Sequence, residues 1–100
     1  MKLSPRERLA LTAYRDTYPD FGFLSFVSIA QRSGLDRSHV RRSIRSLARK
    51  GLAEFSRGLT SDDGDFRGSG YGLTKAGYDE LERTLAAGDD KVAALREAAL

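Results

Sequence analysis

The chain has 100 residues, of which 40% are hydrophobic and 31% charged, a composition typical of one small globular domain. It has no cysteine and one histidine, which argues against disulfides, thiol chemistry and histidine-based zinc sites, so we expect no metal and no cofactor. The formal net charge is +3, and the absence of a signal-peptide core or a membrane-spanning run favours a cytoplasmic protein.

The first expected element is a helix over about residues 5–17. Ser4 and Glu7 have the spacing of a capping box, in which each side chain bonds the backbone N–H of the other residue. The apolar face of this helix consists of Leu9, Leu11, Ala13, Tyr14 and Tyr18. Pro19 is predicted to end the helix, and the apolar stretch 21–24 then predicts a short strand.

A second helix is predicted over residues 26–33. Phe26, Ile29 and Ala30 lie at i, i+3 and i+4, the spacing that puts side chains on one face of a helix. Gly34 follows this segment, and glycine ends helices readily because it adopts the left-handed conformation without a steric penalty.

The third helix, residues 36–50, has signals at both ends and along its face. Asp36 is the expected N-cap, and Leu35 and Val40 flank the helix start at the positions of a hydrophobic staple. Gly51 is predicted to end the helix, with Leu52 placed to contact its last turn. One inward stripe repeats at i, i+4 and i+7 and consists of Val40, Ile44 and Leu47.

After residue 52 the hydrophobic period changes from helical to alternating. Ala53 and Phe55 alternate with polar neighbours, and this pattern is typical of a half-buried strand. Tyr71 and Leu73 alternate with glycines in the same way. The glycine- and aspartate-rich segment 58–70 between the two strands predicts a long hairpin tip.

Two further helices are predicted after the hairpin. Thr74 caps the first of them and Gly88 ends it. The inward face of this helix consists of Tyr78, Leu81 and Leu85. The apolar stripe of the last helix consists of Val92, Leu95 and Ala99. We therefore expect one domain over residues 1–88 and a short helical tail over residues 89–100, which is a candidate dimerisation element or simply packs on its own domain.

This order of elements is that of a winged helix-turn-helix, an α+β and mainly α fold with a three-helix core, a β-hairpin wing and C-terminal helices. Residues 27–52 read VSIAQRSGLDRSHVRRSIRSLARKGL and resemble the helix-turn-helix of bacterial winged-helix transcription regulators. Residues 71–77 read YGLTKAG and resemble the second wing strand and following helix of MarR-like and PadR-like regulators. The resemblance implies a small bacterial or phage DNA-binding protein.

The predicted helix 36–50 is strongly basic, with six basic residues and no acidic one between positions 37 and 50. Like charges at i, i+4 repel, and a solvated helix face normally mixes the two signs. A polyanion would relieve the repulsion. An α-helix fits the major groove of DNA, where arginine can pair with a guanine edge. We therefore predict that the chain binds double-stranded DNA and regulates transcription.

The candidate DNA contacts follow from position. The N-terminal half of a recognition helix usually reads bases, and the residues expected to do so are Ser38, His39, Arg41 and Arg42. The arginines expected to meet phosphates or to flank the reading positions are Arg37, Arg45 and Arg49. Neutral contacts from the preceding helix are expected from Ser25 or Ser28. The wing flanks, which reach toward the minor groove or backbone, carry Arg57 and Arg67.

Other interpretations stay open. One alternative is that the basic helix is merely solvated and binds no partner. Another is that the fold serves as a protein-interaction module. A third is that the chain binds DNA without a fixed operator, as a replication or recombination accessory protein. An enzyme is not expected, because the sequence offers no nucleophile–base pair. The aspartates at positions 62, 63 and 65 look like a calcium loop but lack its bidentate glutamate, so turn chemistry is the simpler interpretation.

The charge is unevenly distributed along the chain. Residues 1–58 hold 12 basic and 5 acidic residues, a net charge of +7, and residues 59–100 hold 5 basic and 9 acidic residues, a net charge of −4. The acidic half is expected to face away from DNA or toward a protein partner. A homodimer is also expected, because a two-fold dimer doubles the base pairs that one recognition helix reads.

Overall fold

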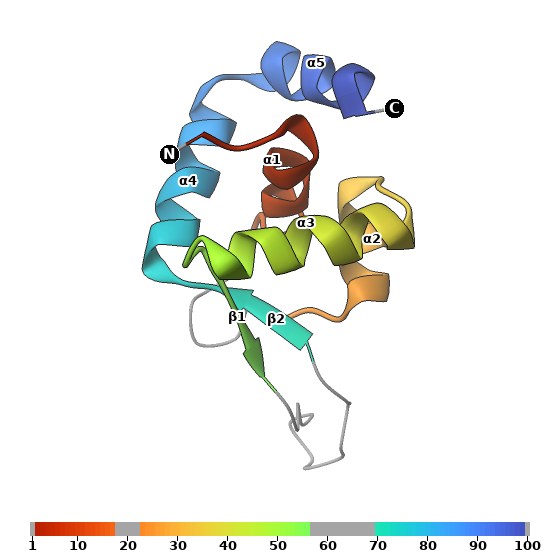
Figure 1. Ribbon diagram of the computed structural model, residues 1–100. Helices are drawn as coiled ribbons and strands as arrows, with labels where there is room; N and C mark the ends of the chain where they lie inside the picture. The colour runs from red at the N-terminus through yellow and green to blue at the C-terminus, as the bar shows by residue number, and fades with distance from the viewer. Residues whose placement is uncertain (1, 18–22, 57–69, 100) are drawn as a thin grey trace.

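The computed structural model describes residues 2–17, 23–56 and 70–99. Within these ranges the elements, in chain order, are α1 (Pro5–Thr12), α2 (Phe26–Ser33), α3 (Arg37–Arg49), β1 (Ala53–Ser56), β2 (Gly70–Leu73), α4 (Lys75–Ala86) and α5 (Asp89–Ala99). The hairpin of β1 and β2 projects from one end of the helical core, and α5 lies at the opposite end (Figure 1). The expected α+β, mainly helical winged helix-turn-helix order is confirmed.

The start of α1 is fixed by the predicted capping box. The Ser4 Oγ accepts a hydrogen bond from the Glu7 backbone N–H at 3.1 Å, and the Glu7 Oε1 accepts one from the Ser4 backbone N–H at 3.0 Å. These bonds satisfy two of the amide groups that a helix N-terminus leaves without an intrahelical partner.

The end of α1 differs from the prediction, because the helix stops at Thr12 instead of continuing to about residue 17. The Arg32 side chain supplies the physical reason. Its Nε donates to the Ala13 carbonyl and its Nη2 to the Arg15 carbonyl, both at 2.5 Å. A distant guanidinium thus satisfies carbonyls after the helix end, and the chain turns away with Asp16 at a φ of 66°.

The helix-turn-helix has the predicted boundaries. Gly34 ends α2 with a φ of 80°, and Asp36 caps α3. At the other end of α3, the Leu52 backbone N–H donates to the Leu47 carbonyl at 2.9 Å. The Gly51 N–H donates to the Ala48 carbonyl at 3.1 Å, which completes a Schellman motif.

The core lies between α1, α2, α3 and α4. The predicted inward stripe of α3, Val40, Ile44 and Leu47, is fully buried. It meets buried side chains of α1 and α2, among them Leu9 and Ile29. Burial of this stripe fixes the rotation of α3 about its axis, so the opposite face of the helix must point to solvent.

The hairpin pairs Ala53 with Leu73 and Phe55 with Tyr71 in antiparallel register. The strand predicted over residues 21–24 is a single bridge between Leu24 and Tyr71 within the described part of the chain; residues 21 and 22 lie outside it. The alternating pattern predicted an inward Phe55, but its side chain is 50% exposed. The strand β1 leads away from the helices (Figure 1), and the Phe55 ring lies against Tyr71, with ring centroids 5.2 Å apart.

The start of α4 is bonded to the end of α3. The Thr74 side chain caps α4 and donates to the Gly51 carbonyl at 2.6 Å, and the Thr74 backbone N–H donates to the Leu52 carbonyl at 3.0 Å. Gly77 lies against the same backbone, where a Cβ would come within 2.0 Å of the Leu52 carbonyl oxygen. The absence of a side chain at position 77 allows this close approach.

The C-terminal helix α5 packs on the chain's own core. Val92 is buried, and Leu95 is half-buried against the same cluster, which is the alternative that the sequence left open for the tail. The side chain of Ala99, the third member of the stripe, lies outside the described part. No helix in the described ranges is long and apolar enough to cross a membrane.

Candidate nucleic-acid interface

The outer face of α3 carries a row of exposed arginines. With Val40, Ile44 and Leu47 buried, the side chains left in solvent on this helix include Arg37, Ser38, Arg41, Arg42, Arg45 and Arg49. We call this set the α3 outer face. The helix crosses the front of the molecule in Figure 1, between the hairpin and α5. The structure therefore brings five of the predicted contact arginines to one surface, and their role in binding stays a prediction.

The N-terminal end of α3 is organised by Asp36. Its Oδ1 accepts from the His39 backbone N–H and from the Ser38 hydroxyl, both at 2.8 Å, and its Oδ2 lies 3.2 Å from the His39 Nδ1. The backbone N–H of His39, followed by the Ser38 hydroxyl, lowers the pKa of the exposed Asp36 carboxyl. The cap holds Ser38 and His39 in place and engages the Ser38 hydroxyl and the His39 Nδ1.

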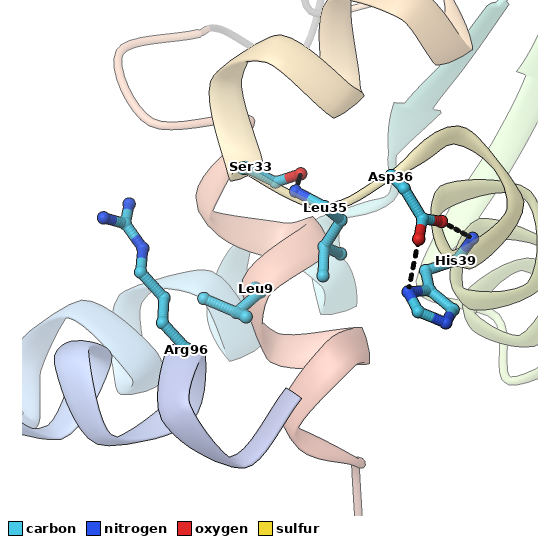
Figure 2. A pocket seen from close by; sticks show the side chains of 7 residues that line it. Leu9, Ser33, Leu35, Asp36, His39 and Arg96 are labelled. Carbon is cyan, nitrogen blue, oxygen red and sulfur yellow. Dashed lines mark hydrogen bonds and ion pairs between the residues drawn. The ribbon is translucent and has the colours of Figure 1, made fainter. Parts of the chain in front are cut away.

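His39 is separated from the arginines by the helix itself. It lines a hollow of about 550 Å³ between α1, the α2–α3 turn and α5. Figure 2 shows His39 and Arg96 on opposite sides of this hollow, with Leu9 and Leu35 between them. The structure thus does not group His39 with the other base-reading candidates.

A second hollow lies on the arginine side of α3. It has a volume of about 420 Å³ and is lined by Phe26, Arg37, Ser38, Arg41 and Arg42. We call it the basic hollow. The sequence pattern assigned Phe26 to the core because of its spacing to Ile29 and Ala30. Phe26 is half-buried: it packs against the core cluster as predicted, and it also lines this hollow at the first residue of α2.

The predicted serines of α2 have a local role. The Ser25 Oγ accepts from the Ser28 backbone N–H at 3.2 Å, which makes Ser25 the N-cap of α2, and it donates to the Ser28 Oγ at 3.2 Å. Both hydroxyls are engaged with each other at the helix start. A neutral contact from either serine to a phosphate stays a prediction.

The basic run ends in a neutralised residue. The Lys50 Nζ lies 2.9 and 2.8 Å from the two carboxylate oxygens of Glu7, whose Oε2 also accepts from the Ser46 hydroxyl at 3.1 Å. Burial favours the neutral acid, but the hydrogen bonds from Lys50, Ser4 and Ser46 prevail and lower the pKa of Glu7. Lys50 therefore adds little free charge to the α3 outer face.

Sequence reasoning also missed Arg6. A small hollow of about 180 Å³ is lined by Arg6 and Ser4 of the α1 start and by Arg42 and Ser43 of α3, among others. Arg6 also contributes to the lowered pKa of Asp36. The basic surface thus extends from α3 onto α1. The only available signal was its position next to the capping box, which says nothing about distance to α3.

The predicted wing contacts, Arg57 and Arg67, lie outside the described residues, as do the aspartates at positions 62, 63 and 65. The described base of the wing contains Phe55 and Tyr71, whose ring centroids are 5.2 Å apart.

No protein-family model and no curated protein matches the chain. Solved structures do. The regulator BpsR of Bordetella bronchiseptica, whose DNA binding is regulated by 6-hydroxynicotinic acid, is 23% identical with a TM-score of 0.67, over 94% of this chain and 65% of that one. A MarR-family transcriptional regulator from Silicibacter pomeroyi is 21% identical with a TM-score of 0.60, over 95% of this chain and 56% of that one.

A Ralstonia eutropha protein proposed to bind DNA is 24% identical with a TM-score of 0.55, over 82% of this chain and 96% of that one. The chain thus spans 65% of the Bordetella regulator and 56% of the Silicibacter regulator, but covers nearly all of the Ralstonia protein. Similarity at this level of identity concerns the fold. The chain has the winged helix-turn-helix fold in the form found in MarR-family transcriptional regulators.

Proposed function

We propose that this chain binds double-stranded DNA through the α3 outer face and acts as a transcriptional regulator. The observation that carries the proposal is the exposure of Arg37, Arg41, Arg42, Arg45 and Arg49 on one face of a helix whose rotation is fixed by a buried stripe. Five exposed guanidiniums on 13 helical residues repel one another unless an anion covers them. A duplex offers that anion in a groove of matching width.

The two halves of α3 have different roles in this proposal. Arg41 and Arg42 line the basic hollow near the N-terminal end and contact base edges, where arginine can bond both acceptors of a guanine. Arg45 and Arg49 lie further along the helix and contact phosphates. The fold similarity to a protein whose DNA binding is regulated and to a MarR-family transcriptional regulator supports a DNA-binding role for the chain.

In this proposal the protein has no enzymatic activity. It binds DNA as a homodimer. One recognition helix reads only a few base pairs, and two copies related by a two-fold axis read a palindrome. Residues 1–88 form the DNA-binding unit in this proposal, with residues 89–100 appended to it. Because Val92 and Leu95 pack on the chain's own core, a dimer contact through α5 must use the outer side of that helix. Sedimentation of the chain with its selected duplex should give two chains for each palindrome.

Selection from a random duplex pool tests the regulator directly. We expect an enriched sequence, and a palindromic one if the protein acts as a dimer. Binding to duplex without any enrichment would favour an accessory protein that binds DNA without an operator. Capture of an acidic protein together with no duplex binding would favour an interaction module.

Arg42→Ala tests the assigned base contact. We expect specific binding to weaken by about 1–3 kcal/mol, while binding to random duplex weakens much less. Arg83→Ala is the matched control, because Arg83 is an exposed arginine of α4 that pairs with Glu80 away from α3. Equal losses on specific and random DNA would reassign Arg42 to a phosphate.

A further inference from the structure

We propose that Phe26 is a specificity-determining residue, whose ring contacts the C5-methyl group of a thymine at the edge of the surface covered by α3. The inference rests on the proposed DNA-binding function and deepens it. It starts from the composition of the basic hollow, in which Phe26 is the one apolar side chain among the described residues, beside Arg37, Ser38, Arg41 and Arg42.

The Phe26 ring is held rigidly. It stacks on Tyr71, with ring centroids 5.6 Å apart and an interplanar angle of 17°. The Tyr71 backbone exchanges two hydrogen bonds of 2.9 Å with Leu24, and its carbonyl also accepts from the Tyr14 hydroxyl at 2.5 Å. Tyr14 is fully buried. The Phe26 ring is thus held by Tyr71, which is itself bonded to Leu24 and to the buried Tyr14. Because the ring is already ordered, its side chain loses little conformational entropy when a ligand binds.

The positive charge of the basic hollow favours an anionic ligand. Three guanidiniums surround the space, so a duplex enters with phosphates and guanine edges near the arginines. The ring then needs an apolar partner. In the major groove, thymine presents a C5-methyl group, and phenylalanine is one of the side chains that contact it. The position of Phe26 at the first residue of α2 places the ring beside the N-terminal, base-reading end of α3.

Replacement of thymine by deoxyuracil tests this contact, because the change removes the methyl group and keeps the hydrogen-bonding edge. Each thymine of the selected sequence is replaced in turn, and each duplex is titrated with the 100-residue chain. We expect one thymine in each half-site whose replacement weakens binding about fourfold, as expected for the burial of one methyl group. This scan needs no protein variant, so it cannot fail through misfolding.

Two variants assign the effect to Phe26. With Phe26→Ala, the thymine and deoxyuracil duplexes should bind equally. With Phe55→Ala, the fourfold difference should remain. The Phe55 ring also contacts Tyr71, with ring centroids 5.2 Å apart, but Phe55 is not among the residues that line the basic hollow. The Phe55→Ala variant therefore tests whether the effect of Phe26→Ala comes merely from a less well held Tyr71 ring.

The outcomes separate the two proposals. An enriched sequence in which no thymine responds to replacement overturns the role of Phe26 and leaves the regulator intact. A response that persists in Phe26→Ala assigns the methyl contact to another side chain and also overturns it. A pool that yields no enriched sequence contradicts the sequence-specific regulator itself, and the inference falls with it.

Discussion

The Lys50 ammonium at the C-terminal end of α3 lies 2.8 Å from the carboxylate of Glu7 in the first turn of α1. The Glu7 Oε1 completes the capping box of its own helix and also accepts from Lys50, and the Oε2 accepts from Lys50 and Ser46. One buried carboxylate thus fixes the start of α1 and holds the recognition helix against it. The orientation of the α3 outer face depends on this contact as well as on the hydrophobic stripe.

Glu7→Gln should lower the free energy of unfolding by about 1–3 kcal/mol, because it removes charge-assisted hydrogen bonds from a nearly buried group. Urea denaturation at neutral pH measures the change. Glu82→Gln, at an exposed position of α4, is the matched control and should change stability by less than about 0.5 kcal/mol. Equal effects of the two substitutions would contradict the role of Glu7.

Acid should weaken the same contact. The pKa of Glu7 is lowered from its ordinary value of 4.5 in the folded chain, so the unfolded chain binds the proton more readily. The stabilisation is therefore present at neutral pH and is lost as the pH falls below about 4.5 and through the folded-state pKa. Urea midpoints measured from pH 7 to pH 3 should fall less steeply for Glu7→Gln than for the natural chain. Parallel curves would show that Glu7 does not contribute to the acid sensitivity.

Ile44→Ala should lower the free energy of unfolding by about 2–5 kcal/mol, because Ile44 is fully buried at the centre of the α3 stripe. Val27→Ala on α2 removes methyl groups from a side chain that is 46% exposed, and should have a much smaller effect. Thermal or urea denaturation compares the two. An Ile44→Ala variant that unfolds like the natural chain would mean that the inward face of α3 is assigned wrongly.

Gly77→Ala should be destabilising, although alanine is favoured over glycine within a helix by about 1 kcal/mol. The new Cβ would lie 2.0 Å from the Leu52 carbonyl oxygen, and this atom belongs to backbone that cannot move aside cheaply. We expect a loss of about 1–3 kcal/mol or more. The sign of the change is the test, because a stabilised variant would show that α4 does not pack this closely on the end of α3.

The sequence predicted best those elements whose signals are local. The bounds of α2 and α3 follow from caps and glycines within a few residues of each end, such as Asp36 and Gly51. The end of α1 was predicted wrongly, because it depends on Arg32, which lies 19 residues from the Ala13 carbonyl that it bonds. A local pattern contains no information about such a partner.

In the candidate site, too, the features with local signals were predicted and those that depend on distant residues were not. The helical period alone places Arg42, Arg45 and Arg49 opposite the buried stripe, with Arg37 and Arg41 flanking them. By contrast, the neutralisation of Lys50 by Glu7 joins residues 43 positions apart, and the place of Phe26 in the basic hollow depends on how α2 crosses α3. The exposure of Phe55 likewise depends on where β1 leaves the helices, which strand alternation does not indicate.

The salt dependence of duplex binding tests the central claim most directly. On a random duplex, where no base is read, all five exposed arginines of the α3 outer face should meet phosphates, so log K should fall against log salt with a slope of about −4 to −5 as counterions are released. Fluorescence anisotropy with a labelled random duplex over a range of salt concentrations measures this slope. The account predicts tight binding at low salt and that slope; no measurable duplex binding at low salt would contradict it.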